Sequence, residues 1–90
     1  MICEGAIVKG ADIDIQDGAL IHPRASLIAD KTKKVVIGES TIIEELVTVH
    51  NSTIKHSNII GVGSTVVGST IGVGNIISPK VISLIYNIKP

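Results

Sequence analysis

The stretch from Ile37 to Ile82 reads IGESTI, IEELVT, VHNST, IKHSNI, IGVGST, VVGST, IGVGNI and ISPKVI, and each of these units opens with Ile or Val. The same phase extends toward the N-terminus as ICEGAI, VKGADID, IQDGAL, IHPRAS and LIADKTKKVV, beginning at Ile2. Thirteen units therefore cover residues 2–82, and nine of them have six residues. A short period sustained over this length is typical of a solenoid, so the sequence predicts a chain that winds in small repeated steps.

Each unit has room for one short strand and one corner. Six residues are too few for a helix-turn-helix unit or a propeller blade, but they suit a strand whose opening residue points inward. Three such strands make a triangular coil, and successive coils stack about 4.8 Å apart. We therefore expect an all-β fold, a single-stranded parallel β-helix of about four coils, in which the opening aliphatic residues form continuous ladders.

The corners have their own sequence pattern. Glycines in IGESTI, IGVGST and IGVGNI are expected at or next to corners, where the missing Cβ permits positive φ. The fifth residue of a unit is small or of modest size and is expected to allow the chain to turn, as in Ala6, Ala19, Ala25, Thr41, Val47, Thr53, Asn58, Ser64, Thr70 and Asn75.

The composition agrees with this fold and excludes several others. β-Branched aliphatic residues, 18 Ile and 10 Val, dominate the 90 residues, whereas Tyr86 is the one aromatic residue. Such side chains favour strands over helices, which argues against a helical bundle or a coiled coil. Hydrophobic residues make up 44% of the chain and the formal net charge is +0, so disorder is not expected. No apolar run reaches the roughly 18 residues that would span a bilayer.

The period is interrupted in two places. The polar excess in the ten-residue unit, around residues 30–34, predicts a loop that leaves a corner of the prism. The period is also lost near the C-terminus, so we expect residues 1–82 to form the β-helix and residues 83–90 to form an irregular tail over the final coil. The first ten residues lack the pattern of a signal peptide, and Cys3, expected to be a small first-coil residue, cannot form an internal disulfide. Both features favour a cytoplasmic location.

Charge is unevenly distributed along the chain. All eight acidic residues precede Leu46, and the second half of the chain holds three basic residues. Three positive charges without stacking aromatics are too few for a nucleic-acid footprint. The lysines of the predicted loop, Lys31, Lys33 and Lys34, could contact a protein partner or form a solvated loop tip.

Three histidines are the strongest candidates for catalytic or metal-binding chemistry. The repeat places His22 and His50 on different faces, which does not favour convergence on one metal ion. Hexapeptide-repeat carbonic anhydrases bind zinc through three histidines that include a His-x4-His pair, and the spacing of His50 and His56 does not match it. Hexapeptide-repeat acyltransferases use a single histidine as a general base, but their additional substrate-binding loops have little counterpart here. Surface histidines without a cofactor are the expectation.

Two further motifs have structural interpretations. The Gly-rich stretch of residues 61–68 does not have the GxxxxGK[ST] spacing of a phosphate-binding loop, and no helix is expected after it. Glu44 and Glu45 are consecutive, so on a strand their side chains would point to opposite sides. We expect one of these carboxylates near the interior edge and the other in water.

The stretch from Ile15 to Asn51 is more specific than the general repeat. Ile21-His22-Pro23-Arg24-Ala25, Val36-Ile37-Gly38-Glu39 and Ile43-Glu44-Glu45, with the polar break between the same two repeats, resemble the dynactin subunit 6 family. This resemblance implies a left-handed coil, no enzymatic activity, no cofactor and a cytoplasmic, cytoskeleton-associated protein that supports dynein-dependent transport. It implies dynactin subunit 5 and the pointed-end actin-related protein as partners, with neither nucleic acid nor membrane. The candidate partner contacts are His22, Arg24, Lys31, Lys33, Lys34, Glu44 and Glu45.

Members of that family are longer, with more coils and a C-terminal helix packed on the prism, whereas this sequence has no helical segment. We therefore expect either a reduced or truncated member or a last coil closed by another chain, and in neither case a free monomer. The alternative is a small hexapeptide-repeat enzyme, either a γ-class carbonic anhydrase or an acyltransferase, that acts as a homotrimer.

Overall fold

The structure is a computed structural model in which the described residues form fourteen short strands. It describes residues 2, 4–10, 12–30 and 33–80, and the backbone of 82–84 and 87–88. The strands are β1 (Ile7–Lys9), β2 (Ile13–Ile15), β3 (Leu20–Ile21), β4 (Ser26–Ile28), β5 (Val35–Ile37), β6 (Ile42–Ile43), β7 (Thr48–His50), β8 (Thr53–Ile54), β9 (Ile59–Ile60), β10 (Thr65–Val67), β11 (Thr70–Ile71), β12 (Ile76–Ile77), β13 (Ile82–Leu84) and β14 (Asn87–Ile88).

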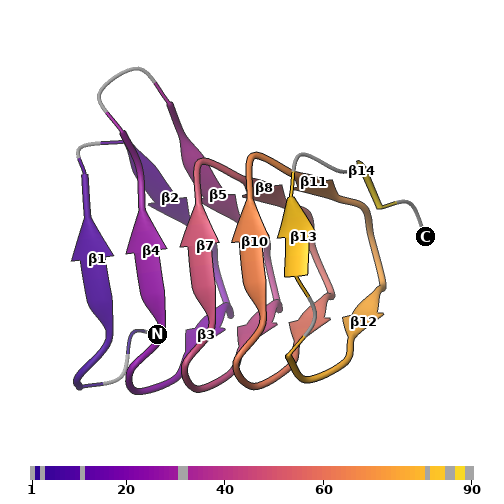
Figure 1. Cartoon of the computed structure of the whole chain (residues 1–90), viewed down its shortest axis with the longest axis horizontal. Coiled ribbons are helices and arrows are strands. Elements are labelled where there is room, and N and C mark those ends of the chain that lie inside the picture. The colour runs from indigo at the N-terminus through magenta and orange to yellow at the C-terminus, as the bar shows by residue number, and fades with distance from the viewer. Residues whose placement is uncertain are drawn as a thin grey trace.

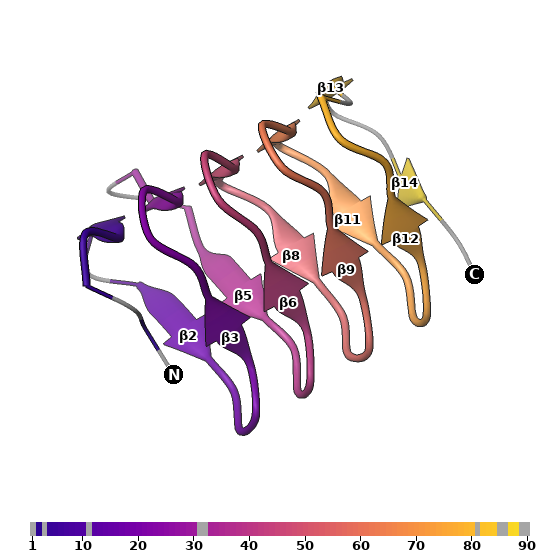
Figure 2. The same cartoon turned by 90° about the horizontal axis from the view of Figure 1, so that it is seen from below.

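The strands form three parallel sheets around one axis. Sheet 1 has the order β1-β4-β7-β10-β13, sheet 2 the order β2-β5-β8-β11-β14 and sheet 3 the order β3-β6-β9-β12. The chain therefore passes from one sheet to the next at every step, and corresponding strands of successive coils lie side by side (Figures 1 and 2). This confirms the predicted all-β parallel solenoid of about four coils. Its left-handed sense stays a prediction.

Corners of successive coils stack into three edges of the prism. Edge 1 leads from sheet 3 to sheet 1, and its corners before β4, β7 and β10 line up along the lower side of Figure 1. Edge 2 leads from sheet 1 to sheet 2, and edge 3 leads from sheet 2 to sheet 3. The edges contain residues 22–25, 44–47, 61–64 and 78–80 (edge 1), 29–30, 33–34, 51–52 and 68–69 (edge 2), and 16–19, 38–41, 55–58 and 72–75 (edge 3).

The opening residues of the units form the core, as predicted. In sheet 2, Ile37 pairs with Ile54, and Ile54 pairs with Ile71; all three side chains are fully buried. Equivalent ladders occupy the inner faces of the other two sheets: Leu27, Val49 and Val66 in sheet 1, and Ile21, Ile43, Ile60 and Ile77 in sheet 3. Each fully buried aliphatic side chain contributes roughly 1.5–3 kcal/mol, so stability resides in these columns.

The buried small residues occupy a position slightly different from the predicted one. The fifth position is buried in most of the described six-residue units, as at Thr41 and Asn58, but it is half-buried at Ala6 and Asn75. In the five-residue units, Ser52 and Ser69 are buried and Thr53 and Thr70 are not. The rule that holds is geometric. The buried corner residue lies two positions before the next inward aliphatic residue, because the side chain between them points outward from the strand.

Positive φ occurs at nearly every described corner, and not only at glycine. Gly63 and Gly74 have φ values of +73° and +74°, as predicted for corner glycines. Gly38 and Gly61 are not in this region and serve a different purpose. A Cβ at Gly61 would lie 2.6 Å from the carbonyl oxygen of Ile77, so these two glycines allow the next coil to approach closely. Six other residues have positive φ: Arg24, Ser40, Leu46, Asn51, Ser57 and Lys80.

The interior of edge 3 contains a ladder of polar side chains. The hydroxyl of Thr41 donates to the carbonyl of Lys55 at 2.8 Å, and the side-chain Nδ2 of Asn58 donates to the same carbonyl at 2.7 Å. The side-chain oxygen of Asn58 accepts from the backbone N–H of Asn75 at 2.7 Å, so each coil is bonded to the next through a buried side chain. Nδ2 of Asn75, at the end of this ladder, is buried without a hydrogen-bond partner.

The two ends of the repeat differ in part from the expectation. Residues 83–90, expected as an irregular tail, include the end of β13 and all of β14, which continue sheets 1 and 2. The physical reason is that the open edge of a parallel sheet offers backbone groups to pair with, whatever the side-chain period of the added segment. At the other end, the opening residues Ile2 and Val8 are exposed because the described chain has no coil below them. Cys3 lies outside the described residues.

Candidate interaction edge

Edge 1 brings together four of the predicted contact residues. His22 and Arg24 lie in one corner, and Glu44 and Glu45 lie in the next corner along the edge. Backbone hydrogen bonds hold these corners in register: His22 N–H donates to the carbonyl of Ile43 at 2.9 Å. Neighbouring corners of this edge therefore differ in charge, with a basic corner next to an acidic one.

The two glutamates differ in exposure, as expected, although they lie in a corner rather than within a strand. Glu44 is half-buried and Glu45 is exposed. Within the described part of the chain, neither carboxylate forms an ion pair, since the ion pair found there joins His50 and Asp30. The acidic corner therefore keeps its negative charge available at the surface.

Leu46 follows these glutamates and was not among the predicted contact residues. Its φ is +62°, a conformation that is unfavourable for a bulky aliphatic residue, and its side chain is 55% exposed. Val62, in the next corner of edge 1, is also exposed. The sequence contained one signal: Leu46 is at the fourth position of its unit, where Gly18, Gly63 and Gly74 stand in other units.

The remaining predicted contacts lie away from edge 1. Lys33 and Lys34 are exposed in the corner between β4 and β5, on edge 2, where the sequence predicted a loop. Lys31 lies outside the described residues. The structure therefore separates the six described candidates into an acidic and basic group on edge 1 and a pair of lysines on edge 2.

A polar cluster fixes the base of the lysine loop. The backbone N–H of Asp30 donates to Oδ1 of Asn51 at 2.9 Å, and Nδ2 of Asn51 donates to the carboxylate of Asp30 at 3.0 Å. Nε2 of His50 lies 3.3 Å from the same carboxylate. The hydrogen bond from Asn51, followed by that from His50, lowers the pKa of Asp30 below its ordinary value of 3.8. This cluster ties the loop to the coil above it.

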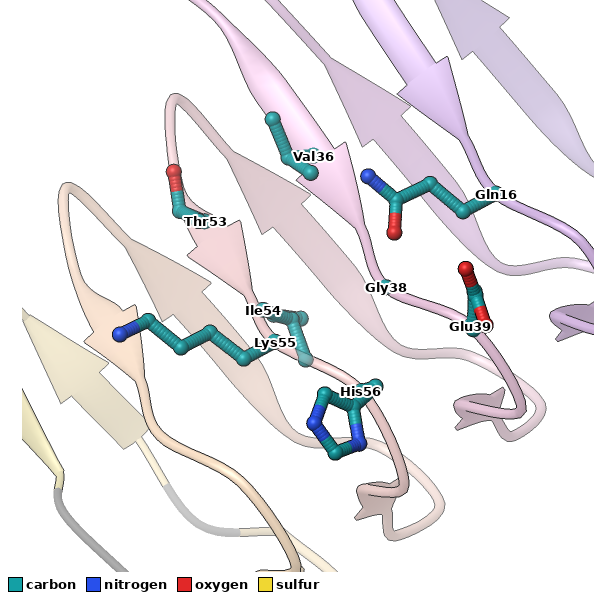
Figure 3. Close-up of a pocket in the computed structure, with 8 residues that line it drawn as sticks. All are labelled: Gln16, Val36, Gly38, Glu39, Thr53, Ile54, Lys55 and His56. Carbon is teal, nitrogen blue, oxygen red and sulfur yellow. The ribbon is translucent and has the colours of Figure 1, made fainter.

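A shallow groove of about 330 Å³ lies on sheet 2 beside edge 3 (Figure 3). In this view the Lys55 side chain extends away from Gln16 and Glu39, so the polar groups around the groove do not converge on one point. His56 contacts Ser57 through Nδ1 at 3.1 Å. The groove is lined by Gln16, Val36, Gly38, Glu39, Thr53, Ile54, Lys55 and His56.

The three histidines lie at separate places on the prism. His22 follows β3 of sheet 3 and His50 ends β7 of sheet 1, so they are on different faces as predicted. His56 lies on edge 3. Across the described ranges, no group of three or more His, Cys, Asp or Glu residues could hold a metal ion. The same ranges contain no helix long and apolar enough to cross a membrane.

The residues that carried the sequence resemblance are now placed: His22 to Arg24 and Glu44 to Glu45 on edge 1, and Gly38 to Glu39 on edge 3. Sequence comparison finds a match of 36% identity over 86 residues with dynactin subunit 6 of Dictyostelium discoideum. This chain is similar to dynactin subunit 6. The match covers 89% of this chain, well beyond the 15–51 stretch that carried the expected resemblance, which is thus confirmed. No protein-family model matches the chain.

The likeness to dynactin subunit 6 concerns part of that protein. The match covers 45% of dynactin subunit 6 from Dictyostelium, so the chain spans about half the length of this relative. The matched region of this chain is its β-solenoid.

Proposed function

We propose that this chain is a non-catalytic structural subunit of dynactin. The observation that carries the proposal is the similarity to dynactin subunit 6 over 89% of the chain. The resemblance includes Arg24 and Glu45, which are exposed corner residues of edge 1 and are not part of the buried ladders. Similarity in surface corners, in addition to the repeat, is what a shared binding role would preserve.

The fold suits a role in assembly. Each corner is held by hydrogen bonds to the corners of neighbouring coils, as between the N–H of Gly63 and the carbonyl of Glu45 at 3.0 Å. Side chains on an edge are therefore presented at fixed spacing on a rigid support, which reduces the entropy lost when a partner binds. A prism of this kind can contact separate partners through separate edges.

The partners proposed are those of the pointed-end complex. The chain would pair with dynactin subunit 5 and contact the pointed-end actin-related protein. The proposed contacts are His22, Arg24, Glu44 and Glu45 on edge 1, Lys33 and Lys34 on edge 2, and Lys31, which lies outside the described residues. In this role it would be cytoplasmic and cytoskeleton-associated, would not persist as a free monomer, and would help dynein-dependent transport along microtubules and attachment of cargo.

Affinity purification of the tagged chain from its native cell tests the proposal. We expect dynactin subunits, including the actin-related protein, to co-purify in fixed ratio, as judged by mass spectrometry and by sedimentation of the recovered complex. Isolation of a homotrimer that contains about one zinc ion per chain, or that turns over acetyl-coenzyme A, would instead support a hexapeptide-repeat enzyme and contradict the proposal.

A further inference from the structure

Leu46 combines two features that are both unfavourable in an isolated prism. Its φ of +62° places a branched aliphatic residue in the left-handed region, at a cost of roughly 1–2 kcal/mol. Its side chain is 55% exposed, so this conformation is not compensated by burial. The other non-glycine residues with positive φ in the described chain are polar or charged: Arg24, Ser40, Asn51, Ser57 and Lys80.

The exposure of Leu46 is not an effect of the ends of the prism. Ile2, Ile7 and Val8 are exposed in the first coil, and Ile76 is exposed in the last complete coil. Leu46 and Val62 are the large exposed hydrophobic residues of the described chain that have corners on both sides along their edge. Leu46 and Val62 are therefore exposed even though each has a neighbouring coil on both sides.

Leu46 and Val62 lie close together on edge 1. The N–H of Gly63 bonds to the carbonyl of Glu45, so the corner that contains Val62 stacks directly on the corner that contains Leu46. Because Ile43 pairs with Ile60, Val62 stacks on Glu45, and Leu46 is the next residue of that corner. Stacked corners are about 4.8 Å apart, which brings the two exposed aliphatic residues onto one surface of edge 1 as diagonal neighbours. Glu44 and Glu45 border this surface, and neither carboxylate has an ion-pair partner among the residues described.

We propose that Leu46 and Val62 form an apolar knob that inserts into an apolar socket on a protein partner, with basic side chains of the partner beside the socket. Charge complementarity identifies this partner chemistry, because the carboxylates of Glu44 and Glu45 flank the knob and form no ion pair with a cation among the described residues. The strained backbone of Leu46 holds its side chain outward, where it can contact the partner in the complex. The inference rests on the proposed function and assigns the contact edge of that assembly.

The arrangement has the usual organisation of a small interface. An apolar centre loses water on binding, and polar groups at its rim set specificity and the dependence on salt. Loss of the Leu46 side chain should weaken binding at least tenfold. Raising the ionic strength should weaken it further, since exposed charges are screened over about 10 Å at 0.1 M salt.

The test uses dynactin subunit 5 with the pointed-end actin-related protein as the reconstituted probe, and compares Leu46→Gly with the matched control Ser57→Gly. Ser57 has a φ of +61° and lies on edge 3, so both substitutions relieve the same backbone strain. We expect Leu46→Gly to keep or raise the thermal midpoint of the chain while it weakens binding at least tenfold. Ser57→Gly should leave binding unchanged. If Leu46→Gly does not fold, Leu46→Asn serves instead, because Asn tolerates the left-handed region.

A charge test separates the rim from the knob. Glu45→Lys should weaken binding to the same probe at low salt, and Glu39→Lys on edge 3 should not. Equal affinity of the wild-type chain and Leu46→Gly would overturn the assignment of edge 1 while leaving the proposed function intact. Tighter binding by Glu45→Lys would overturn the basic character of the socket. No binding by the wild-type chain would contradict the proposed function, and this inference with it.

Discussion

At the scale of single residues, the corner glycines belong to two classes with different physical roles. Gly74 has a φ of +74°, and a Cβ added there would meet no atom within 4 Å, so its role is conformational. Gly38 has no positive φ, but a Cβ there would lie 2.5 Å from the backbone nitrogen of His56. Its role is therefore to let the next coil approach, and the atoms in the way are backbone atoms that cannot rotate aside.

The two classes predict different costs for the same substitution. Gly38→Ala forces two coils apart and should lower the free energy of unfolding by about 2–3 kcal/mol. Gly74→Ala adds only left-handed strain and should cost about 1 kcal/mol. Urea unfolding of both variants measures the difference. An equal or smaller loss for Gly38→Ala would mean that the coils separate more easily than their hydrogen bonds indicate.

The sequence predicted which residues point inward, because a strand alternates its side chains and a β-branched opening residue has one stable place to be buried. The sequence pattern predicted the wrong buried residue in the five-residue units. These units are one residue shorter in the corner, so counting five positions from the opening residue passes the buried residue by one. Leu46 escaped prediction for a related reason. In a repeat of aliphatic residues, a leucine is expected in the core. Leu46 is exposed because the corner imposes a positive φ on it, and this backbone conformation is not visible in the sequence.

At the scale of strands and edges, side-chain ladders connect coils where the strands are too short to do so alone. β8 and β9 have two residues each, and the edge between them holds Asn58, which bonds to the backbone of both its own coil and the next. Such contacts were not predicted from the sequence. The sequence predicted that corner residues are small. It did not predict their hydrogen bonds, because these depend on two coils lying in register.

Asn58→Ala should lower the free energy of unfolding by about 2–3 kcal/mol, because a fully buried side chain is truncated and the partly buried N–H of Asn75 loses its acceptor. Asn75→Ala provides the matched control at the end of the ladder. Its own Nδ2 has no partner, so its removal should cost less than about 1 kcal/mol. Hydrogen exchange of the Asn75 amide should accelerate in Asn58→Ala; unchanged exchange would show that this bond is not what protects it.

Asp30, Lys33 and Lys34 lie exposed outside the strands, as predicted, because such polar residues cannot enter an aliphatic column. The attachment of the lysine loop was not predicted. The contact between Asp30 and Asn51 joins consecutive coils across edge 2, and nothing in the spacing of these residues indicates it. The same limit applied to the contact candidates, which the fold divided between edges 1 and 2.

The attachment of the loop predicts a specific pH dependence. In Asn51→Gly, glycine readily adopts the positive φ of Asn51 but the main hydrogen bond to Asp30 is lost. The pKa of Asp30, below 3.8 in the wild-type chain, should rise toward that value. Because the folded pKa is lowered, the stabilising effect is present at neutral pH and is lost as the pH falls through the folded pKa. Carboxyl-carbon NMR titration measures the shift; an unchanged midpoint would assign the lowering to His50.

At the scale of the whole molecule, the core is a column in which each coil is covered by its neighbours, and this resolves how a chain with one aromatic residue buries its apolar surface. Contacts are made along the axis and not across a wide interior. The composition predicted this architecture well, because narrow columns accept Ile and Val and exclude larger rings. The repeat makes the opening residues of all units look equivalent. Their contributions to stability differ, however, because residues near an end of the column are covered less than residues in its middle.

The column predicts a gradient of mutational cost. Ile54 is fully buried between Ile37 and Ile71, so Ile54→Ala should lower the free energy of unfolding by about 2–5 kcal/mol. Val8 opens its unit in the same way but is 42% exposed, so Val8→Ala should cost less than about 1 kcal/mol. Thermal unfolding of the two variants provides the comparison. Similar costs would indicate that the first coil is covered in solution.

Register in the later coils has a consequence for how such a gene can change. Paired residues of these coils are separated by 17 positions, as are Thr48 and Thr65, and the N–H of Ser69 donates to the hydroxyl of Ser52 at the same spacing. Thr48 and Thr65 occupy equivalent rungs, so in-frame loss of the codons for residues 49–65 would join Thr48 to Val66 and place Val66 against Leu27. Duplication of the same segment would insert a coil with equal ease. Proteins of this architecture can therefore gain or lose length by whole coils, through single recombination events that leave every remaining strand paired.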